Sequence, residues 1–388
     1  MRDPGGVSLT LVTGPANAEK ARVVLDGYRA AAERAPLLVV PTFADVVRYR
    51  TELAEGGLVF GTAIVRFRQL AQEMARKAGV RGRGLTHLQR DRVAAAAIAS
   101  VELEVLRRSS QTAGFAHALV RLAGELEQGR VDPPRFTSAL RAWAGGTSRA
   151  AYAEELAALY AAYRATLERM GRSDDDLRLA AAVDGLRAEP ARWGARPVFV
   201  YGFDDLRPLQ REAIAVLAAT GADVTVSLTF EPGRYAFAGR TETIEALRPL
   251  ATEIVELPAT AHHYADPALH HLERRLFEPP EDGALFDALA PEIDPARPAI
   301  VLMEGGGERA ELELVAAEVA RMVREDGIPP DEIAVVARDV RAIAPQLRRV
   351  FAAAGVPLAL ERHAVFGHTP LGAGLIALVR CALLDGTA

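Results

Sequence analysis

The sequence has little lysine, a single cysteine and no long hydrophobic run, and each shortage narrows what the protein can be. Lys20 and Lys77 are the two lysines among 46 basic residues, so every other basic side chain is arginine. Cys381 alone excludes a disulfide framework or a cysteine-rich metal site within this chain. A net charge of −5 argues against a surface that is basic throughout and binds nucleic acid everywhere, but it is compatible with local basic faces.

No apolar run is long enough to span a membrane, and the first residues, MRDPGGVSLT, lack a signal-peptide pattern. These absences predict a soluble, cytoplasmic protein without a membrane partner. Half of the 388 residues are hydrophobic and a quarter are charged, which is ordinary for a globular protein. The length is sufficient for two or three domains with cores of their own.

The stretch LTLVTGPANAEKA, residues 9–21, has the layout of a phosphate-binding loop. An apolar run predicts a buried strand, Gly14 begins a tight turn, and a helix follows. The pattern of such loops is G-x-x-x-x-G-K-[ST]. Gly14 and Lys20 hold their places in it. Glu19 instead replaces the second glycine, and Ala21 replaces the hydroxyl residue.

Both replacements remove chemistry that a nucleotide needs. Glycine at the position of Glu19 lets backbone N–H groups close around phosphate oxygens, whereas a carboxylate repels them. The hydroxyl residue is a ligand of Mg²⁺, and Ala21 offers none. We therefore interpret the turn as a nucleotide loop that has lost its nucleotide. The alternative is an ordinary strand–turn–helix of an α/β domain.

Apolar strands alternate with amphipathic helices near both ends of the chain, which predicts an α/β fold with a doubly wound parallel sheet. From residue 86 to about 190 the strand signal disappears, and apolar residues recur at helical spacing, which predicts a helical insertion. Residues 258–298 show little regular structure beyond one short helix predicted at residues 270–277, HHLERRLF. A second α/β unit begins near Ala299, with strands expected at 299–304, at 332–339 and after Gly355.

The pairs His262/His263 and His270/His271 raise the question of a metal site. Adjacent histidines on a helix point to different faces, and no carboxylate or cysteine pattern completes a ligand set. The sequence therefore predicts no metal site.

Two further segments resemble two sequence motifs that occur together in one known family. Residues 173–177, SDDDL, match D-F-D-D-L, and residues 332–338, EIAVVAR, match I-A-V-L-x-R. With the loop at Gly14 and the order of elements, they resemble UvrD/Rep-type superfamily 1 helicases, and more closely the AddB-like subunits of AddAB- and AdnAB-type helicase–nucleases. The resemblance covers almost the whole chain. It implies a RecA-like parallel-sheet domain with an all-helical insertion, followed by a second, partial RecA-like domain. The implied boundaries are 1–85 and 193–258 for the first domain, 86–192 for the insertion, 259–297 for a linker and 298–388 for the second domain.

The nucleotide motifs of that family are altered here. Its second motif, D-E-F-Q-D-[ST]-x-P-L-Q, binds Mg²⁺ and positions the attacking water through the D-E pair. Residues 201–210, YGFDDLRPLQ, keep the Phe and the Pro-Leu-Gln, so the D-E places fall on Tyr201 and Gly202. A shifted register puts Asp204 and Asp205 there but breaks the Pro-Leu-Gln match.

The next motif, G-D-D-D-Q-S-I-Y-x-F-R-G-A, uses its Gln to sense the γ-phosphate. Residues 228–239, LTFEPGRYAFAG, keep the Tyr, the Phe and the final Gly, but Pro232 stands in place of the Gln.

Positions on the DNA side are kept. Residues 41–43, PTF, stand where the family has a Thr-Phe-Thr-type motif, and residues 61–68, GTAIVRFR, resemble the next DNA-contact motif. Aromatic faces and arginines suit single strands, because every base can stack and phosphates attract guanidinium groups. The alternative is that the aromatic residues are core and the arginines a solvated face. The candidate DNA-binding residues are Thr42, Phe43, Arg48, Arg50, Thr62, Arg66, Arg68, Tyr235 and Phe237.

The leading hypothesis is a catalytically inactive, helicase-like portion of a subunit that processes DNA double-strand breaks. It would bind single-stranded DNA and a motor subunit, and it would need no cofactor or metal. The resemblance also implies a C-terminal PD-(D/E)XK nuclease in the full-length protein, often with an iron–sulfur cluster, so the chain is expected to be an N-terminal portion. One rival is an active ATP-dependent helicase that uses Mg·ATP, Lys20 and Asp204 or Asp205. The other is a protein-interaction scaffold that binds neither ATP nor DNA.

Overall fold

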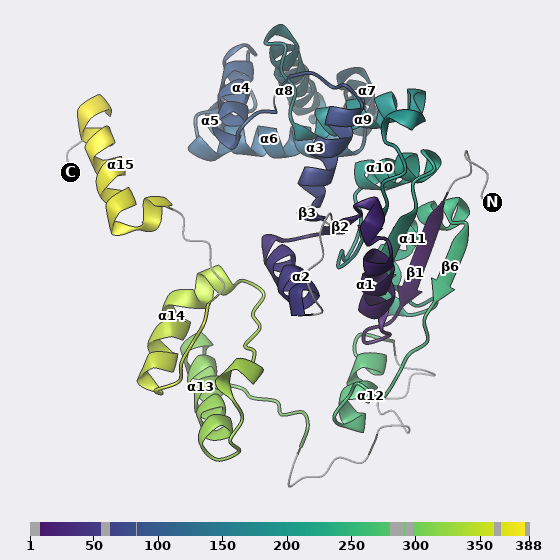
Figure 1. The fold of residues 1–388 in the computed structure, drawn as a ribbon. Coiled ribbons are helices and arrows are strands. Elements are labelled where there is room, and N and C mark those ends of the chain that lie inside the picture. Colours follow the sequence, from purple (N-terminus) through teal and green to yellow (C-terminus); the bar gives the residue numbers. More distant parts are fainter. Residues whose placement is uncertain are drawn as a thin grey trace. The chain divides into compact units, whose positions relative to one another are not determined.

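The computed structural model of the chain describes residues 8–55, 63–82, 84–279, 291, 298–360 and 366–384. The chain divides into two compact units, Met1–Pro291 and Glu292–Ala388 (Figure 1). Each unit is described by itself.

The first unit is built around one six-stranded sheet of order β3-β2-β4-β5-β1-β6, in which every neighbouring pair is parallel. This confirms the predicted α/β fold with a parallel sheet. In Figure 1, β1 lies beside β6, although 243 residues separate their partners Leu11 and Ile254. The strands are β1 (Leu9–Gly14), β2 (Leu37–Val40), β3 (Ala63–Arg66), β4 (Val198–Val200), β5 (Val224–Thr229) and β6 (Glu253–Glu256).

The central strands are buried on both faces, which is why they read as continuous apolar runs. Successive side chains of a strand point to opposite faces. Leu37 and Val39 of β2 accordingly belong to one core cluster, and Leu38 and Val40 belong to another. The first cluster includes residues of α3 (Phe67–Lys77), α9 (Asp175–Ala188) and α10 (Pro208–Ala219), and the second includes residues of α1 (Lys20–Ala30) and α2 (Phe43–Glu55).

Residues 84–192 carry helices and no strand. Their side chains form a core cluster of their own, with Tyr160 and Tyr163 fully buried. Asp132 and Asp174 begin two of these helices with side-chain caps. The helices are α4 (His87–Ala99), α5 (Arg107–Ser110), α6 (Ala113–Gln128), α7 (Pro133–Ala144), α8 (Ala150–Arg169) and α9.

The strand β6 was not predicted. Its residues are mostly exposed, because it lies at the edge of the sheet with a neighbour on one side only. The helix α11 (Thr241–Leu247) precedes β6. After β6, the short helix α12 (Pro267–Arg275) confirms the one helix predicted in the segment that follows.

The second unit has a core between α13 (Glu308–Arg324) and α14 (Val340–Ala353), and it also contains α15 (Pro370–Leu384). The strands predicted at 299–304, at 332–339 and after Gly355 are wrong for the part of this unit that the structure describes, where these segments form no ladder. Ile333 and Val335 only pack partly against the helices. Leu302 is 94% exposed, so the apolar pattern is not matched by burial on a sheet.

Candidate nucleotide loop and DNA-contact residues

All strands of the sheet are parallel, so their carboxyl ends lie at one edge. Ligands of open α/β sheets bind at that edge. The predicted site residues that the structure describes lie at these strand ends or in the loop and helix that follow β1, β2, β3 and β5. The fold therefore brings the nucleotide-type loop and the DNA-contact candidates to the same edge.

The loop between β1 and α1 keeps the glycine turn. A Cβ on Gly14 would lie 2.9 Å from the carbonyl oxygen of Leu257 and 3.0 Å from the Cβ of Ala18, so no larger residue fits. Asn17 and Glu19 have left-handed backbones, with φ of 55° and 59°. Glu19 thus occupies, with a side chain, a conformation that glycine adopts without strain.

Lys20 is turned into its own loop. Its side chain is 8% exposed, and Nζ donates to the carbonyl oxygen of Gly14 at 3.0 Å and to that of Pro15. Burial lowers the pKa of Lys20 to about 8; Glu273 opposes this shift, and Arg240 adds to it. The ammonium group that would reach a phosphate is therefore hydrogen-bonded to backbone carbonyls, and burial makes it easier to deprotonate.

Glu19 places a carboxylate at the mouth of this loop. One oxygen, Oε2, pairs with Arg22 at 2.5 Å, and Oε1 lies 3.3 Å from His262 Nε2 and 3.6 Å from His263 Nε2. The Arg22 hydrogen bond is the main reason why the pKa of Glu19 lies below its ordinary value. The group is therefore negatively charged at neutral pH and repels phosphate oxygens.

A pocket of about 530 Å³ opens beside the loop, lined by residues 17–22 together with Tyr201 and His263. Tyr201 is the residue that stands at a Mg²⁺-binding place in the resembled family. Its ring packs edge-on against Tyr49 at 5.7 Å, and burial raises its pKa, so its hydroxyl stays neutral. A neutral phenol offers a poor ligand for Mg²⁺, which prefers carboxylates and water.

The two aspartates of the shifted register do not line that pocket. Asp204 is almost fully exposed and pairs with Arg240 at 3.4 Å. Asp205 accepts a hydrogen bond from the hydroxyl of Thr243 on α11. Both carboxylates thus contact side chains, Arg240 and Thr243, that follow β5 in the sequence.

The two aromatic candidates after β5 differ in exposure. Tyr235 is 68% exposed and available for stacking, whereas Phe237 is buried. The guanidinium groups of Arg234 and Arg240 lie 4.9 Å and 5.5 Å from the centre of the Phe237 ring. Phe237 therefore packs within the protein in this structure.

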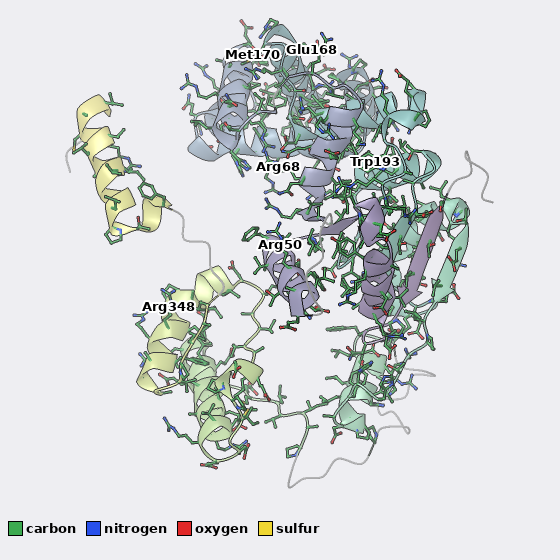
Figure 2. All side chains as sticks on the ribbon, in the orientation of Figure 1. Arg50, Arg68, Glu168, Met170, Trp193 and Arg348 are labelled. Atoms are coloured by element: carbon green, nitrogen blue, oxygen red, sulfur yellow. The ribbon has the colours of Figure 1, made fainter. Side chains whose placement is uncertain are left out.

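The candidates on α2 form a mixed aromatic and basic surface. Phe43, Arg48 and Arg50 are exposed, and Arg50 is labelled in Figure 2. The hydroxyl of Thr42 is engaged in the helix start, where it accepts from the backbone N–H of Asp45 at 3.1 Å and donates to its carboxylate at 2.6 Å. Thr42 thus stabilises the start of α2, whose first residue is Phe43, and it is also exposed to solvent.

The candidates after β3 begin with Arg66, which is half-buried at the strand end. Arg68 is exposed on α3 and pairs with Asp175 at 3.2 Å. Phe67 between them packs against Phe203, with ring centres 6.2 Å apart. Thr62 lies outside the described residues.

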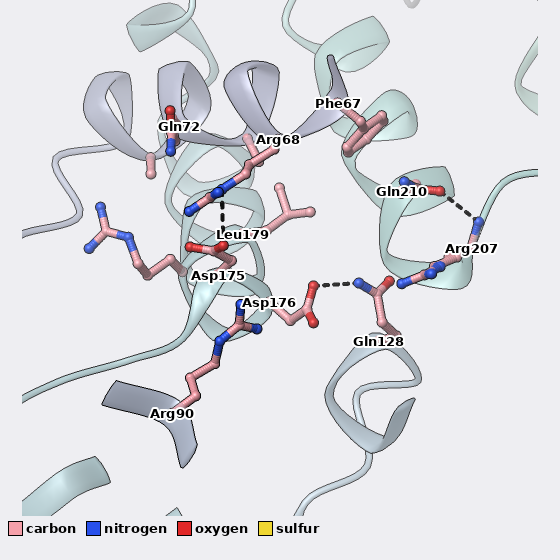
Figure 3. Close-up of a pocket in the computed structure, with 13 residues that line it drawn as sticks. Phe67, Arg68, Gln72, Arg90, Gln128, Asp175, Asp176, Leu179, Arg207 and Gln210 are labelled. Atoms are coloured by element: carbon pink, nitrogen blue, oxygen red, sulfur yellow. Dashed lines mark hydrogen bonds and ion pairs between the residues drawn. The ribbon is translucent and has the colours of Figure 1, made fainter. Parts of the chain in front are cut away.

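A second pocket, of about 250 Å³, adjoins Arg68 and was not predicted (Figure 3). In Figure 3, Arg68 points to Asp175, and Gln128 points to Asp176. The helices α3, α4, α6, α9 and α10 supply its lining, so no local sequence pattern joins the members. Its polar lining consists of Arg68, Gln72, Arg90, Gln128, Asp175, Asp176, Arg178, Arg207 and Gln210.

The acidic groups near this pocket are perturbed by burial. Burial and then the Asp174 charge raise the pKa of Asp176 to about 6. Nearby Glu127 is fully buried, and burial raises its pKa to about 11, so it is neutral at pH 7. In the lining itself, four arginines, Arg68, Arg90, Arg178 and Arg207, face the two carboxylates of Asp175 and Asp176, so positive charge is in excess, which suits an anionic ligand.

The first unit is an α/β protein with an all-parallel sheet covered by helices. At the carboxyl edge of this sheet, a glycine turn is followed by a helix that begins with a lysine, which is the layout of a nucleotide-binding loop. Residues 11–273 match the family described as ADDB, N-terminal, and the chain belongs to that family. The resemblance to AddB-like subunits is thereby confirmed.

Relatives that are named as a subunit of an ATP-dependent helicase/deoxyribonuclease match almost the whole chain. Those from Symbiobacterium thermophilum and Pelotomaculum thermopropionicum are each 28% identical, over 97% of this chain and 34% of their own length. The relative from Desulfitobacterium hafniense strain DCB-2 is 28% identical over 73% of this chain and 24% of its own. The chain thus spans about a third of the length of the curated relatives it matches. In the described residues, no helix is both long and apolar enough to cross a membrane.

Proposed function

We propose that the chain is the helicase-like part of an AddB-type subunit and that it binds single-stranded DNA without hydrolysing ATP. The sheet would then be a RecA-like domain with residues 86–192 as its helical insertion, and residues 298–388 would belong to a partial second one. A motor subunit would supply ATP hydrolysis, and the complex would process DNA double-strand breaks. The name of the relatives, which describes one subunit of a helicase/deoxyribonuclease, supports this setting.

The observation that carries the proposal is the state of Lys20. In phosphoryl transfer, the loop lysine and a bound Mg²⁺ neutralise the phosphates. Here the Lys20 ammonium is held by two loop carbonyls, and the Glu19 carboxylate stands at the loop mouth. A nucleotide would have to displace these contacts and approach a negative charge, and for a metal Ala21 offers no hydroxyl and Tyr201 no carboxylate.

Charge and exposure at the carboxyl edge support binding of DNA. Phe43 and Tyr235 present exposed rings, and Arg48, Arg50 and Arg68 present exposed guanidinium groups. Stacking and phosphate contacts of this kind are tolerant of sequence. The arginines around the second pocket extend the cationic surface beyond Arg68.

The rival is an active ATPase, and one observation favours it: a pocket of about 530 Å³ lies next to Lys20 and has room for a nucleotide. Calorimetric titration of Mg·ATP into the full chain, up to millimolar nucleotide, separates the two. We expect no saturable heat and no phosphate release. Saturable binding that Lys20→Ala abolishes would establish the rival instead.

The DNA part is tested on exposed residues, because truncating buried Phe237 could disturb the fold. The variant Phe43→Ala/Arg50→Ala should weaken binding of a fluorescent oligo-dT at least tenfold, since one stacked base contributes about 1–3 kcal/mol. The control Arg107→Ala/Tyr152→Ala likewise removes one arginine and one aromatic ring, on exposed positions of α5 and α8. Equal affinities of both variants and the parent chain would remove the DNA site from Phe43 and Arg50, and a parent chain that binds no oligo-dT would favour the protein-interaction scaffold.

A further inference from the structure

The loop after β6 is fastened onto the loop after β1. The backbone N–H of Leu257 donates to the carbonyl of Thr13 at 2.8 Å, and the hydroxyl of Thr260 donates to the carbonyl of Asn17 at 3.0 Å. These two bonds bring residues 261–264, which form a turn, over the start of α1. The two histidines of that turn are thereby placed against a residue far away in the sequence.

The histidines His262 and His263 and the carboxylate of Glu19 form a compact set of ligand atoms. Both Nε2 atoms approach the same oxygen, Oε1, at 3.3 Å and 3.6 Å, and the donor atoms of all three residues lie within 4.8 Å of one another. The two imidazole ring centres are 4.0 Å apart. Adjacent side chains diverge on a helix, which is why the sequence predicts no metal site here. In this turn both rings lie on one side, and the fold adds the missing carboxylate.

The spacing is that of ligands around one small cation. Zinc is held by nitrogen at about 2.0–2.1 Å and by carboxylate oxygen at about 2.0–2.2 Å in a tetrahedron, which puts neighbouring ligand atoms roughly 3.3–3.4 Å apart. The two distances to Glu19 Oε1 fall close to this value. Three protein ligands leave a fourth position for water, as in zinc sites with an open position.

The ligand atoms discriminate between metals. Ca²⁺ and Mg²⁺ take oxygen ligands, of which this set offers one carboxylate only. Imidazole nitrogens prefer zinc and other late transition metals. Arg22 pairs with Oε2 of Glu19 and leaves Oε1 to the histidines.

We propose that Glu19, His262 and His263 form a Zn²⁺-type transition-metal site that clamps the β6–α12 loop over the β1–α1 loop. The proposal goes beyond the function proposed above and does not depend on it, since the site requires neither DNA nor ATP. Metal bound there would hold the loop that begins at Gly14 closed. Glu19, which stands where the phosphate-binding loop pattern has a glycine, would then have a function as a metal ligand.

The experiment is equilibrium dialysis of the full, tag-free chain against Zn²⁺, with the bound metal counted by elemental analysis. The visible spectrum of the Co²⁺-loaded chain reports the coordination geometry. Glu19→Gln keeps the shape and removes the charge, and His263→Ala removes one ring. His117→Ala removes an exposed histidine of α6 and is the matched control. Circular dichroism verifies that each variant is folded.

We expect one Zn²⁺ per chain, a tetrahedral Co²⁺ spectrum, and at least tenfold weaker binding in Glu19→Gln and His263→Ala, with His117→Ala unchanged. Zinc should also raise the melting temperature of the parent chain and not that of the two site variants. Substoichiometric zinc in the parent chain, or equal affinity in all variants, would overturn the site and leave a His–Glu ion pair only.

Discussion

Lys20 makes the stability of the protein depend on pH. Its ordinary pKa of 10.5 falls to about 8 in the folded state, because its charged form is buried. Between these two values the unfolded chain binds more protons than the folded one, so this group makes stability rise as pH increases. Below about pH 8 both states are protonated, and the penalty for burying the charge is fully present.

The variant Lys20→Met removes that titration. We expect the difference in free energy of unfolding, parent minus variant, to increase by about 1–3 kcal/mol from about pH 7.5 to about pH 10.5. Urea denaturation of both chains across this range measures it. A difference that stays constant with pH would mean that Lys20 is not buried as a charge in solution.

The residues at the loop mouth show what a single sequence can and cannot predict. Gly14 and Lys20 were found because their spacing repeats a local pattern. The approach of Glu19 to His262 was not predictable, because it depends on β6 pairing with β1 across 243 residues. The burial of Phe237 beside two arginines agrees with the alternative that the aromatic residues are core, between which and a stacking site the motif could not decide.

At the scale of elements, burial decides which predictions succeed. The strands β1, β2, β4 and β5 are mostly buried and rich in apolar residues, and these strands were predicted. The edge strand β6 combines charged and apolar residues and was missed. In residues 298–360 apolar runs were predicted as strands, but nothing in the described part pairs with them, so they form no sheet.

One carboxylate organises the start of α5 within the helical segment. Glu155 of α8 accepts hydrogen bonds from the backbone N–H groups of Glu104, Val105 and Leu106 at 2.7, 2.8 and 2.9 Å. Burial raises the pKa of Glu155, but these three bonds outweigh it and lower the pKa overall. Its stabilisation is therefore present above the ordinary pKa of 4.5 and is lost as pH falls through the folded-state value.

The variant Glu155→Gln replaces one acceptor oxygen by an amide that cannot accept. We expect a loss of about 1–2 kcal/mol in the free energy of unfolding at about pH 7, and a smaller loss once the pH has fallen through the lowered folded-state pKa and the parent carboxylate is protonated. Urea denaturation followed by circular dichroism provides the measurement. Glu168→Gln, an exposed change on the same helix, is the control and should be within about 0.5 kcal/mol of the parent. An equal effect of the two changes would contradict the role of Glu155.

At the scale of the whole molecule, the two compact units have separate cores. Three clusters of buried residues lie within residues 9–247, and the fourth lies within residues 312–356. Every candidate DNA-contact residue belongs to the first unit, between Thr42 and Phe237. Under the proposed function, the first unit alone should therefore be sufficient to bind single-stranded DNA.

A fragment of residues 1–279 tests this separation. We expect it to unfold cooperatively and to bind oligo-dT within about threefold of the full chain, because it keeps the whole sheet and the exposed residues Phe43, Arg50 and Tyr235. Its affinity should fall with salt, since phosphate contacts release counterions. Fluorescence anisotropy at two salt concentrations measures both effects, and the Phe43→Ala/Arg50→Ala version of the fragment is the control. A folded fragment that has lost binding would assign essential DNA contacts to residues 280–388 and contradict a site confined to the carboxyl edge of the sheet.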